Sequence, residues 1–165
     1  MKRTKNPAKE AEYRKRAADL VAQMTLHEKV SQMLSWAPAI ERLGIPAYNW
    51  WSEGIHGVGR AGTATVFPQA IGMAAAFDED MMEQVGNAVG VEARGKYNMC
   101  RAHGDRDIFK GLTVWAPNIN IFRDPRWGRG HETYGEDPFL TSRLGVRFVE
   151  GMQGDDPDYL QAAAC

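Results

Sequence analysis

The hydrophobic and polar positions of the first 34 residues predict two helices in succession. Residues 7–24 carry apolar side chains at helical spacing, on Ala17, Leu20, Val21 and Met24. Thr25 and Glu28 then form the T-x-x-E pattern of a capping box, which predicts a second, short helix ending near Leu34. Pro38 and the run Gly44-Ile45-Pro46 prevent any further helix in this part of the chain.

The rest of the chain predicts short extended segments separated by helices. Residues 48–51 and 112–116 are rich in aromatic and β-branched side chains and predict strands, and the pattern of the second is compatible with an extension to Ile121. Residues 67–77 are apolar and small, which predicts another buried segment. Two helices are expected, at 79–98 after the N-cap residue Asp78 and from Pro138 onward, the latter with an apolar face of Leu140, Leu144, Phe148 and Met152. Residues 159–165 resemble the start of a further buried strand.

This alternation of strands and helices predicts a parallel α/β fold. The polar, aromatic and glycine-rich loops follow the strands and precede the helices, which is where the loops of an α/β barrel line its active face. A doubly wound open sheet shows the same alternation, so periodicity leaves both architectures open. A barrel of eight βα units needs ~250 residues, and only three or four strands are expected here, so we expect a partial domain.

Composition and charge narrow the class of protein. The chain has 165 residues, of which 44% are hydrophobic and 25% charged, as in a soluble globular domain. A net charge of −1 argues against a nucleic-acid-binding protein, which would carry a basic stripe. The basic residues near the N-terminus are interrupted by acidic ones and are interpreted as a solvated helix face; they are Lys2, Arg3, Lys5, Lys9, Arg14, Lys15 and Arg16.

No apolar run approaches the ~20 residues that would span a membrane, and no secretory signal follows the basic N-terminus. We therefore expect no membrane association and, if residue 1 is the true start, a cytoplasmic location. Cys100 and Cys165 are too few and too far apart for a disulfide framework or a zinc site. Both are expected to be small buried apolar residues, and His27 is expected to be exposed.

The first motif whose side chains could support binding or catalysis is the run YNWWSEGIHG at residues 48–57. Aromatic faces such as those of Trp50 and Trp51 stack on the C–H faces of sugar rings, and a carboxylate such as Glu53 accepts hydrogen bonds from neighbouring hydroxyls. Together they indicate a monosaccharide subsite. The alternative is that one tryptophan belongs to the core and Glu53 caps a turn, and the residues alone leave both interpretations open.

The second motif is a loop at residues 121–132 that carries three arginines, two acidic residues and a tryptophan. The rigid donor fork of arginine suits neighbouring hydroxyls or carboxylates. The alternative is an internal ion-pair network in which Asp124 and Glu132 each hold an arginine, and both interpretations can be true together. The run His103 to Asp107 lacks metal-ligand spacing and predicts a polar loop, and no dinucleotide or phosphate-binding fingerprint is present.

Several of these runs, in this order, resemble the N-terminal domain of glycoside hydrolase family 3. The resemblance covers residues 17–165 and is carried by residues 48–57, 67–74 (FPQAIGMA), 116–129 (APNINIFRDPRWGR) and 132–138 (ETYGEDP). The run Trp50-Trp51-Ser52-Glu53 is most similar to the bacterial β-xylosidase branch. The resemblance implies a (β/α)8 barrel, preceded here by a helical lead-in at residues 1–24. Residues 25–165 would be the first three to four βα units of that barrel, incomplete at the C-terminus.

The resemblance also implies a function and a site. The family comprises retaining exo-acting β-glycosidases without metal or organic cofactor, and β-xylosidase is favoured here over β-glucosidase. The expected substrates are β-linked xylo- or gluco-oligosaccharides or aryl glycosides. By motif match, Glu53 and Arg129 should contact the nonreducing terminal sugar. Trp51, His56, Arg126 and Glu132 would be supporting residues or further contacts.

The departures from the family pattern concern the chemistry. The lysine–histidine pair, the aspartate nucleophile and the acid/base of the family are all expected beyond Cys165, whereas retaining hydrolysis needs two carboxyl groups about 5–5.5 Å apart. We therefore expect the isolated chain to be inactive and poorly stable. Two alternatives are a sugar-binding module without catalysis and a structural remnant that binds nothing.

Overall fold

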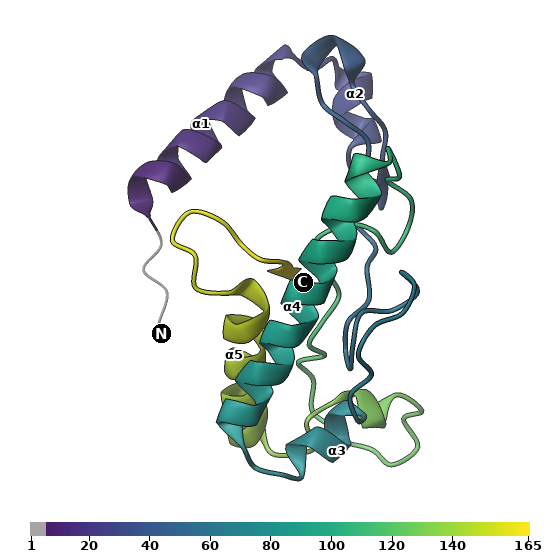
Figure 1. Ribbon diagram of the computed structural model, residues 1–165, viewed down its shortest axis with the longest axis vertical. Coiled ribbons are helices and arrows are strands. Elements are labelled where there is room, and N and C mark those ends of the chain that lie inside the picture. The colour runs from purple at the N-terminus through teal and green to yellow at the C-terminus, as the bar shows by residue number, and fades with distance from the viewer. Residues whose placement is uncertain (1–5) are drawn as a thin grey trace.

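The computed structural model describes residues 6–165, and its helices and short strands alternate along the chain (Figure 1). Two helices come first, α1 (Pro7–Gln23) and α2 (Leu26–Ser31). The remaining elements, in order, are β1 (Trp36–Ala37), η1 (Glu41–Leu43), β2 (Tyr48–Asn49), α3 (Ala70–Ala74), α4 (Glu79–Ala102), β3 (Thr113–Val114), η2 (Gly130–Glu132), α5 (Pro138–Gln153) and β4 (Ala163–Ala164).

Three short segments lie side by side in parallel. β3 pairs with β4 in the register Thr113 to Ala163, and on its other side Val114 bridges to Ser52, just after β2. The Trp115 amide donates to the Ser52 carbonyl at 2.8 Å, which continues this ladder. The spatial order is therefore the 52 segment, β3 and β4, while β1 and β2 form a separate antiparallel pair. This parallel arrangement, with helices between the strands, is of the α/β class.

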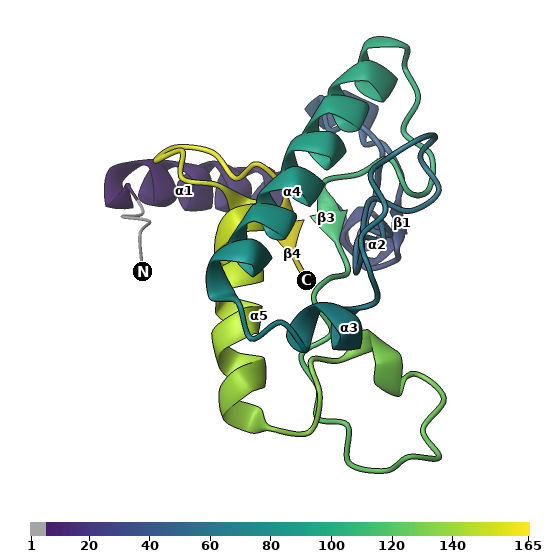
Figure 2. The same cartoon turned by 60° about the horizontal axis from the view of Figure 1, so that its bottom comes forward.

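The core lies between α4, α5 and the parallel segments (Figure 2). Helix α5 starts as expected, with Pro138 in its first turn and the Asp137 side chain accepting from the Leu140 amide at 2.6 Å. Its predicted apolar face is confirmed, since Leu144, Phe148 and Met152 are fully buried. The Asp78 N-cap of α4 is confirmed too, and that helix runs four residues further than expected, to Ala102.

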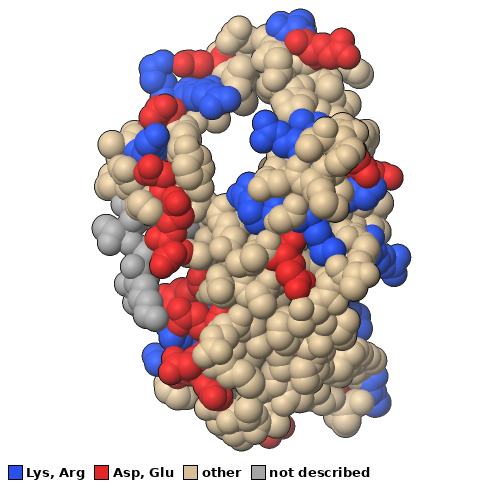
Figure 3. Space-filling view, viewed as in Figure 1, with Lys and Arg blue, Asp and Glu red and all other residues tan. Residues whose placement is uncertain are grey.

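Helix α1 forms as predicted, and an opening separates part of it from the rest of the molecule in the space-filling view (Figure 3). At its N-terminal end, the Asn6 amide side chain donates to the Asp158 carboxylate at 3.1 Å. The helix buries none of its residues, and Val21 is 47% exposed. Of its apolar positions, Ala17 and Val21 are exposed and Leu20 and Met24 are partly buried. Arg14, Lys15 and Arg16 are solvated as expected, whereas Lys2, Arg3 and Lys5 lie outside the described residues. Across residues 6–165, no helix combines the length and the apolar character needed to cross a bilayer.

The local predictions for residues 67–77, for β3 and for the cysteines have different outcomes. The buried segment predicted at 67–77 is confirmed in part, since it contains the short helix α3, whose Ala70, Met73 and Ala74 are buried. The extension of β3 and the burial of the cysteines are wrong. β3 ends at Val114 and does not extend to Ile121, since Pro117 has no N–H for a ladder and the Ile121 amide bonds instead to the Asn120 side chain at 2.9 Å.

The cysteines are also not buried. Cys100 is half-buried and Cys165 is exposed, because the first lies on a partly solvated face of α4 and the second follows β4 at the edge of the parallel segments. His27 is exposed, as expected.

The capping box at α2 gives a testable pH effect. The Glu28 carboxylate accepts from the Thr25 amide at 2.8 Å and from Arg42 Nε at 2.8 Å. These hydrogen bonds, that of Arg42 first, lower the pKa of Glu28 from 4.5 to about 2. Because the folded pKa is depressed, the stabilisation is present above pH 4.5 and is lost as pH falls toward 2. The melting temperature of Glu28→Gln should thus lie below that of the wild type at pH 6, and the difference should shrink between about pH 4.5 and 2. A difference that stays constant over that range would contradict this assignment.

Candidate functional site

The two motifs singled out from the sequence lie on the side of α4 that faces away from α1 (Figures 1 and 2). Glu53 directly follows Ser52, which bridges in parallel to Val114 of β3, and Trp115 directly follows Val114. Because the carboxyl ends of neighbouring parallel strands meet at one edge, the residues after each strand come together there. This is the edge at which α/β barrels place their sites.

Two tryptophans stack at this edge. The rings of Trp51 and Trp115 lie 4.4 Å apart between centroids at an interplanar angle of 23°, and they remain 36% and 42% exposed. The Trp115 indole N–H donates to the Trp50 carbonyl at 2.9 Å, which fixes the stack to the neighbouring segment. Trp50 is itself 46% exposed, so the alternative that one of the adjacent tryptophans belongs to the core is wrong.

Glu53 presents its carboxylate beside this stack. Its Oε1 accepts from the Trp51 indole N–H at 3.3 Å, and its Oε2 lies 3.9 Å from Arg60 Nε. The turn that follows is closed by the backbone, since the Gly59 amide donates to the Glu53 carbonyl at 2.9 Å. The carboxylate is therefore not used to cap the turn, and its half-exposed oxygens remain within reach of a ligand.

The arginine-rich loop is ordered by ion pairs, as one of the two interpretations predicted. Arg126 holds Asp124 through contacts of 2.6 and 3.0 Å, and Arg129 holds Glu132 through contacts of 2.5 and 2.8 Å. The hydrogen bonds of the second pair raise the pKa of Arg129 and lower the pKa of Glu132. The charge of Glu53 makes a further, smaller contribution to the raised pKa of Arg129.

His56 lies inside the turn. Its Nδ1 is 3.0 Å from the Phe67 carbonyl oxygen, and the Phe67 amide donates back to the His56 carbonyl at 2.8 Å. Gly57 next to it adopts a φ of 128°, and a Cβ there would lie 2.2 Å from the Thr65 carbonyl oxygen. His56 therefore links the turn that carries Glu53 to the segment at Phe67.

Sequence reasoning missed two residues of this site. Trp115 lies near the end of the strand predicted at 112–116, as Trp51 ends the one predicted at 48–51, and a parallel pairing of the two would have indicated their contact. Arg60 gave no such signal, because its contact with Glu53 depends on the fold of the intervening turn. Within residues 6–165, no cluster of three or more histidine, cysteine or acidic side chains is placed to hold a metal ion.

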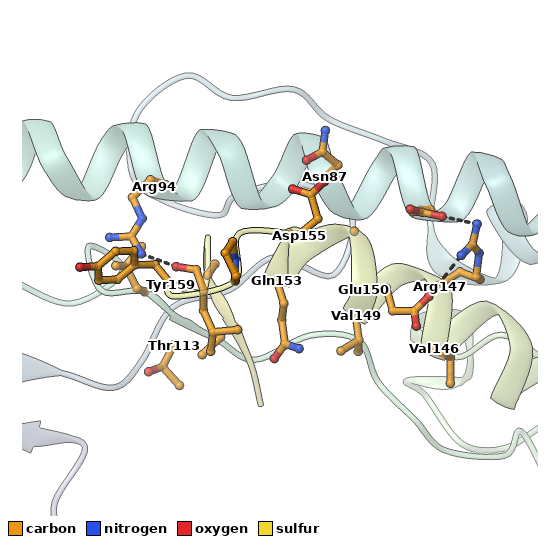
Figure 4. A pocket seen from close by; sticks show the side chains of 18 of the residues that line it. Asn87, Arg94, Thr113, Val146, Arg147, Val149, Glu150, Gln153, Asp155 and Tyr159 are labelled. Carbon is orange, nitrogen blue, oxygen red and sulfur yellow. Dashed lines mark hydrogen bonds and ion pairs between the residues drawn. The ribbon is translucent and has the colours of Figure 1, made fainter. Parts of the chain in front are cut away.

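A large open cavity lies away from this site. It has a volume of about 1690 Å³ and is lined by residues of α1, α4, α5 and the segment before β4, and by none of the predicted site residues. Figure 4 shows its α4 and α5 walls. Two of its arginines are engaged within the structure: Arg147 pairs with Asp80 at 3.0 Å, and Arg94 donates to the Leu160 carbonyl at 2.5 Å. The cavity is thus an open face of the fold on the α1 side, away from the aromatic stack.

Comparison with known proteins agrees with the family suggested by the motifs. The model of the glycosyl hydrolase family 3 N-terminal domain matches residues 16–163. A probable β-D-xylosidase 7 of Arabidopsis thaliana is 50% identical over 168 residues, covering 92% of this chain and 21% of that protein. A xylan 1,4-β-xylosidase of Xylanibacter ruminicola is 48% identical over 155 residues, covering 92% of this chain and 18% of that protein. The chain thus spans about a fifth of the length of these relatives.

Solved structures agree with these relatives. A family 3 exo-β-xylosidase, XlnD, in complex with a xylobiose aziridine probe superposes with a TM-score of 0.81 at 38% identity, over 91% of this chain and 20% of that one. A family 3 β-glucosidase of Bifidobacterium adolescentis gives a TM-score of 0.66 at 31% identity, over 81% of this chain and 18% of that one. The chain belongs to glycosyl hydrolase family 3, and its residues 16–163 match the N-terminal domain of that family.

Proposed function

We propose that this chain forms the sugar-recognition part of a retaining exo-β-glycosidase, with a β-xyloside preferred over a β-glucoside. The observation that carries the proposal is the exposed stack of Trp51 on Trp115 with the Glu53 carboxylate at its edge. A flat aromatic face beside a hydrogen-bond acceptor suits a sugar ring, whose C–H faces are apolar and whose hydroxyls point outward from the edge. The preference for xylose is supported by the β-xylosidases among the relatives.

Glu53 and Arg129 are the proposed contacts to the terminal sugar. Glu53 would accept from hydroxyls, and Arg129 would donate to them through guanidinium hydrogens not used by Glu132. Trp51 positions Glu53 through its indole N–H, while Arg126 and Glu132 hold the loop. His56 supports the turn from behind.

The parallel segments at Ser52, β3 and β4 are, in this proposal, the first strands of a (β/α)8 barrel. The spatial order of the segments supports it, because consecutive strands of such a barrel are neighbours. Further βα units would then cover the large face between α1 and α5.

The proposal assigns recognition to this chain and the bond-breaking chemistry to other residues of the enzyme. A retaining mechanism needs a carboxylate nucleophile and a carboxylic acid about 5–5.5 Å apart across the glycosidic bond. The groups that contact Glu53 in the described structure are instead an indole N–H and a guanidinium, which suit a carboxylate that binds hydroxyls.

Two measurements test this division. The purified 165-residue chain should release no nitrophenol from 4-nitrophenyl β-xyloside. A hybrid in which residues 16–163 replace the matching segment of the Xylanibacter ruminicola β-xylosidase should release nitrophenol from this substrate. Its kcat/KM for the β-xyloside should be higher than its kcat/KM for the β-glucoside. Turnover by the chain alone would contradict the division, and a folded hybrid that neither hydrolyses nor binds xylobiose would contradict the recognition role.

A further inference from the structure

Arg60 makes two contacts that together fix its side chain against the Glu53 turn. Its guanidinium carbon lies 5.2 Å from the centroid of the Phe109 ring, and its Nε lies 3.9 Å from Glu53 Oε2. A guanidinium over an aromatic face is attracted by the negative charge of that face. The side chain is 71% exposed, so these two contacts, rather than burial, set its direction.

The backbone at both partners is unusual. Arg60 has a φ of 59° and Phe109 a φ of 68°, in the left-handed region that side chains other than glycine rarely adopt. Neither residue is in a helix or strand, and they come from different loops, one after β2 and one between α4 and β3. Two such residues in direct contact at a candidate site indicate a geometry that the surrounding structure enforces.

Hydrogen bonds from neighbouring segments hold both loops in this geometry. The Phe109 amide donates to the Trp51 carbonyl at 2.8 Å, so the loop that carries the ring is bonded to the segment that carries the stack. On the other side, Lys96 on α4 donates to the Ala61 carbonyl at 2.9 Å and holds the residues directly after Arg60. The hollow beneath Glu53 and Phe109 has a volume of about 10 Å³, at the lower limit for a single water, so these groups pack closely.

We propose that Arg60 is a positioning residue for Glu53, supported from below by the Phe109 ring. Trp51 holds one carboxylate oxygen and Arg60 lies against the other, so the carboxylate is oriented before a sugar arrives. This inference rests on the proposed function, in which Glu53 contacts the sugar. If Arg60 instead contacted the substrate directly, its effect on binding would not depend on Glu53.

A double-mutant cycle in the hybrid β-xylosidase separates these roles. With Glu53 present, Arg60→Ala should lower kcat/KM for 4-nitrophenyl β-xyloside about five- to tenfold, the scale of one exposed ion pair and one cation–π contact. In the Glu53→Gln background, the same substitution should change kcat/KM by less than about twofold, because residues that act through one another are not additive. Arg60→Lys should recover part of the loss, since lysine keeps the charge but not the planar stack.

Three outcomes overturn the inference. Equal losses in both backgrounds would mean that Arg60 acts independently of Glu53, and an unchanged kcat/KM for Arg60→Ala would mean that it positions nothing. If Glu53→Gln alone leaves kcat/KM unchanged, the proposed function itself fails, and the inference fails with it. Arg101→Ala, an exposed substitution in the last turn of α4, is the matched control for loss of an arginine and should leave kcat/KM unchanged.

Discussion

Replacement of Glu53 by glutamine in the hybrid β-xylosidase should lower kcat/KM for an aryl β-xyloside by about 10²- to 10³-fold, because charged hydrogen bonds contribute ~1.5–3 kcal/mol each. Glutamine keeps the size of the side chain and one acceptor oxygen, but it loses the charge and one of the two acceptors. The indole N–H of Trp51 and the guanidinium of Arg60 would then face an uncharged amide. The loss should therefore come from recognition, with the fold unchanged.

The measurement is steady-state kinetics together with a melting curve for each variant. Asp19→Asn is the matched control, since Asp19 is an exposed carboxylate on α1, on the other side of α4 from the aromatic stack, and its replacement should leave kcat/KM within about twofold. A Glu53→Gln variant that melts like the parent and retains full kcat/KM would remove Glu53 from the binding site. Such a result would favour a purely structural role for the segment.

The regular elements were accessible from the sequence where local signals were strong. The caps at Thr25, Asp78 and Asp137 act through side chains on amides three residues ahead, so their positions can be read from spacing alone. What the pattern left open has a common cause. The burial of the apolar positions of α1 and the helical form within residues 67–77 depend on what packs against them, and a one-dimensional pattern does not contain that information.

The contacts of the candidate site also fall into those between residues close in sequence, which could be predicted, and those between distant segments, which could not. The motif around Glu53 and the ion pairs of the arginine loop involve residues close in sequence, such as Arg129 and Glu132 three apart, and both were predicted. The stack of Trp51 on Trp115 joins the residues next to Ser52 and Val114, which bridge in parallel, and the contact of Arg60 with Phe109 joins two loops. Both contacts depend on the fold and not on spacing along the chain.

A substitution of Gly151 or Gly86 by alanine should destabilise the fold by about 3 kcal/mol, the upper part of the range for overpacked sites. These glycines form the contact between α4 and α5, where the helices cross with their backbones close together. A Cβ on Gly86 would lie 2.2 Å from the Phe148 carbonyl oxygen, and one on Gly151 would lie 2.0 Å from the Glu83 carbonyl oxygen. Because both obstacles are backbone atoms, the helices must move apart to relieve them.

The same helix provides the control. Gly95 is exposed on α4, and a Cβ there meets no atom within 4 Å, so Gly95→Ala should be neutral or should stabilise the fold by about 0.5–1 kcal/mol through its gain in helix propensity. Urea unfolding of the 165-residue chain, followed by circular dichroism, measures all three variants. Opposite signs for Gly86→Ala and Gly95→Ala would separate the cost of the helix contact from the gain in propensity. If both alanines stabilised the chain, α4 and α5 could not be packed as closely as the structure has them, and the parallel segments would lose the support that places Trp51 beside Trp115.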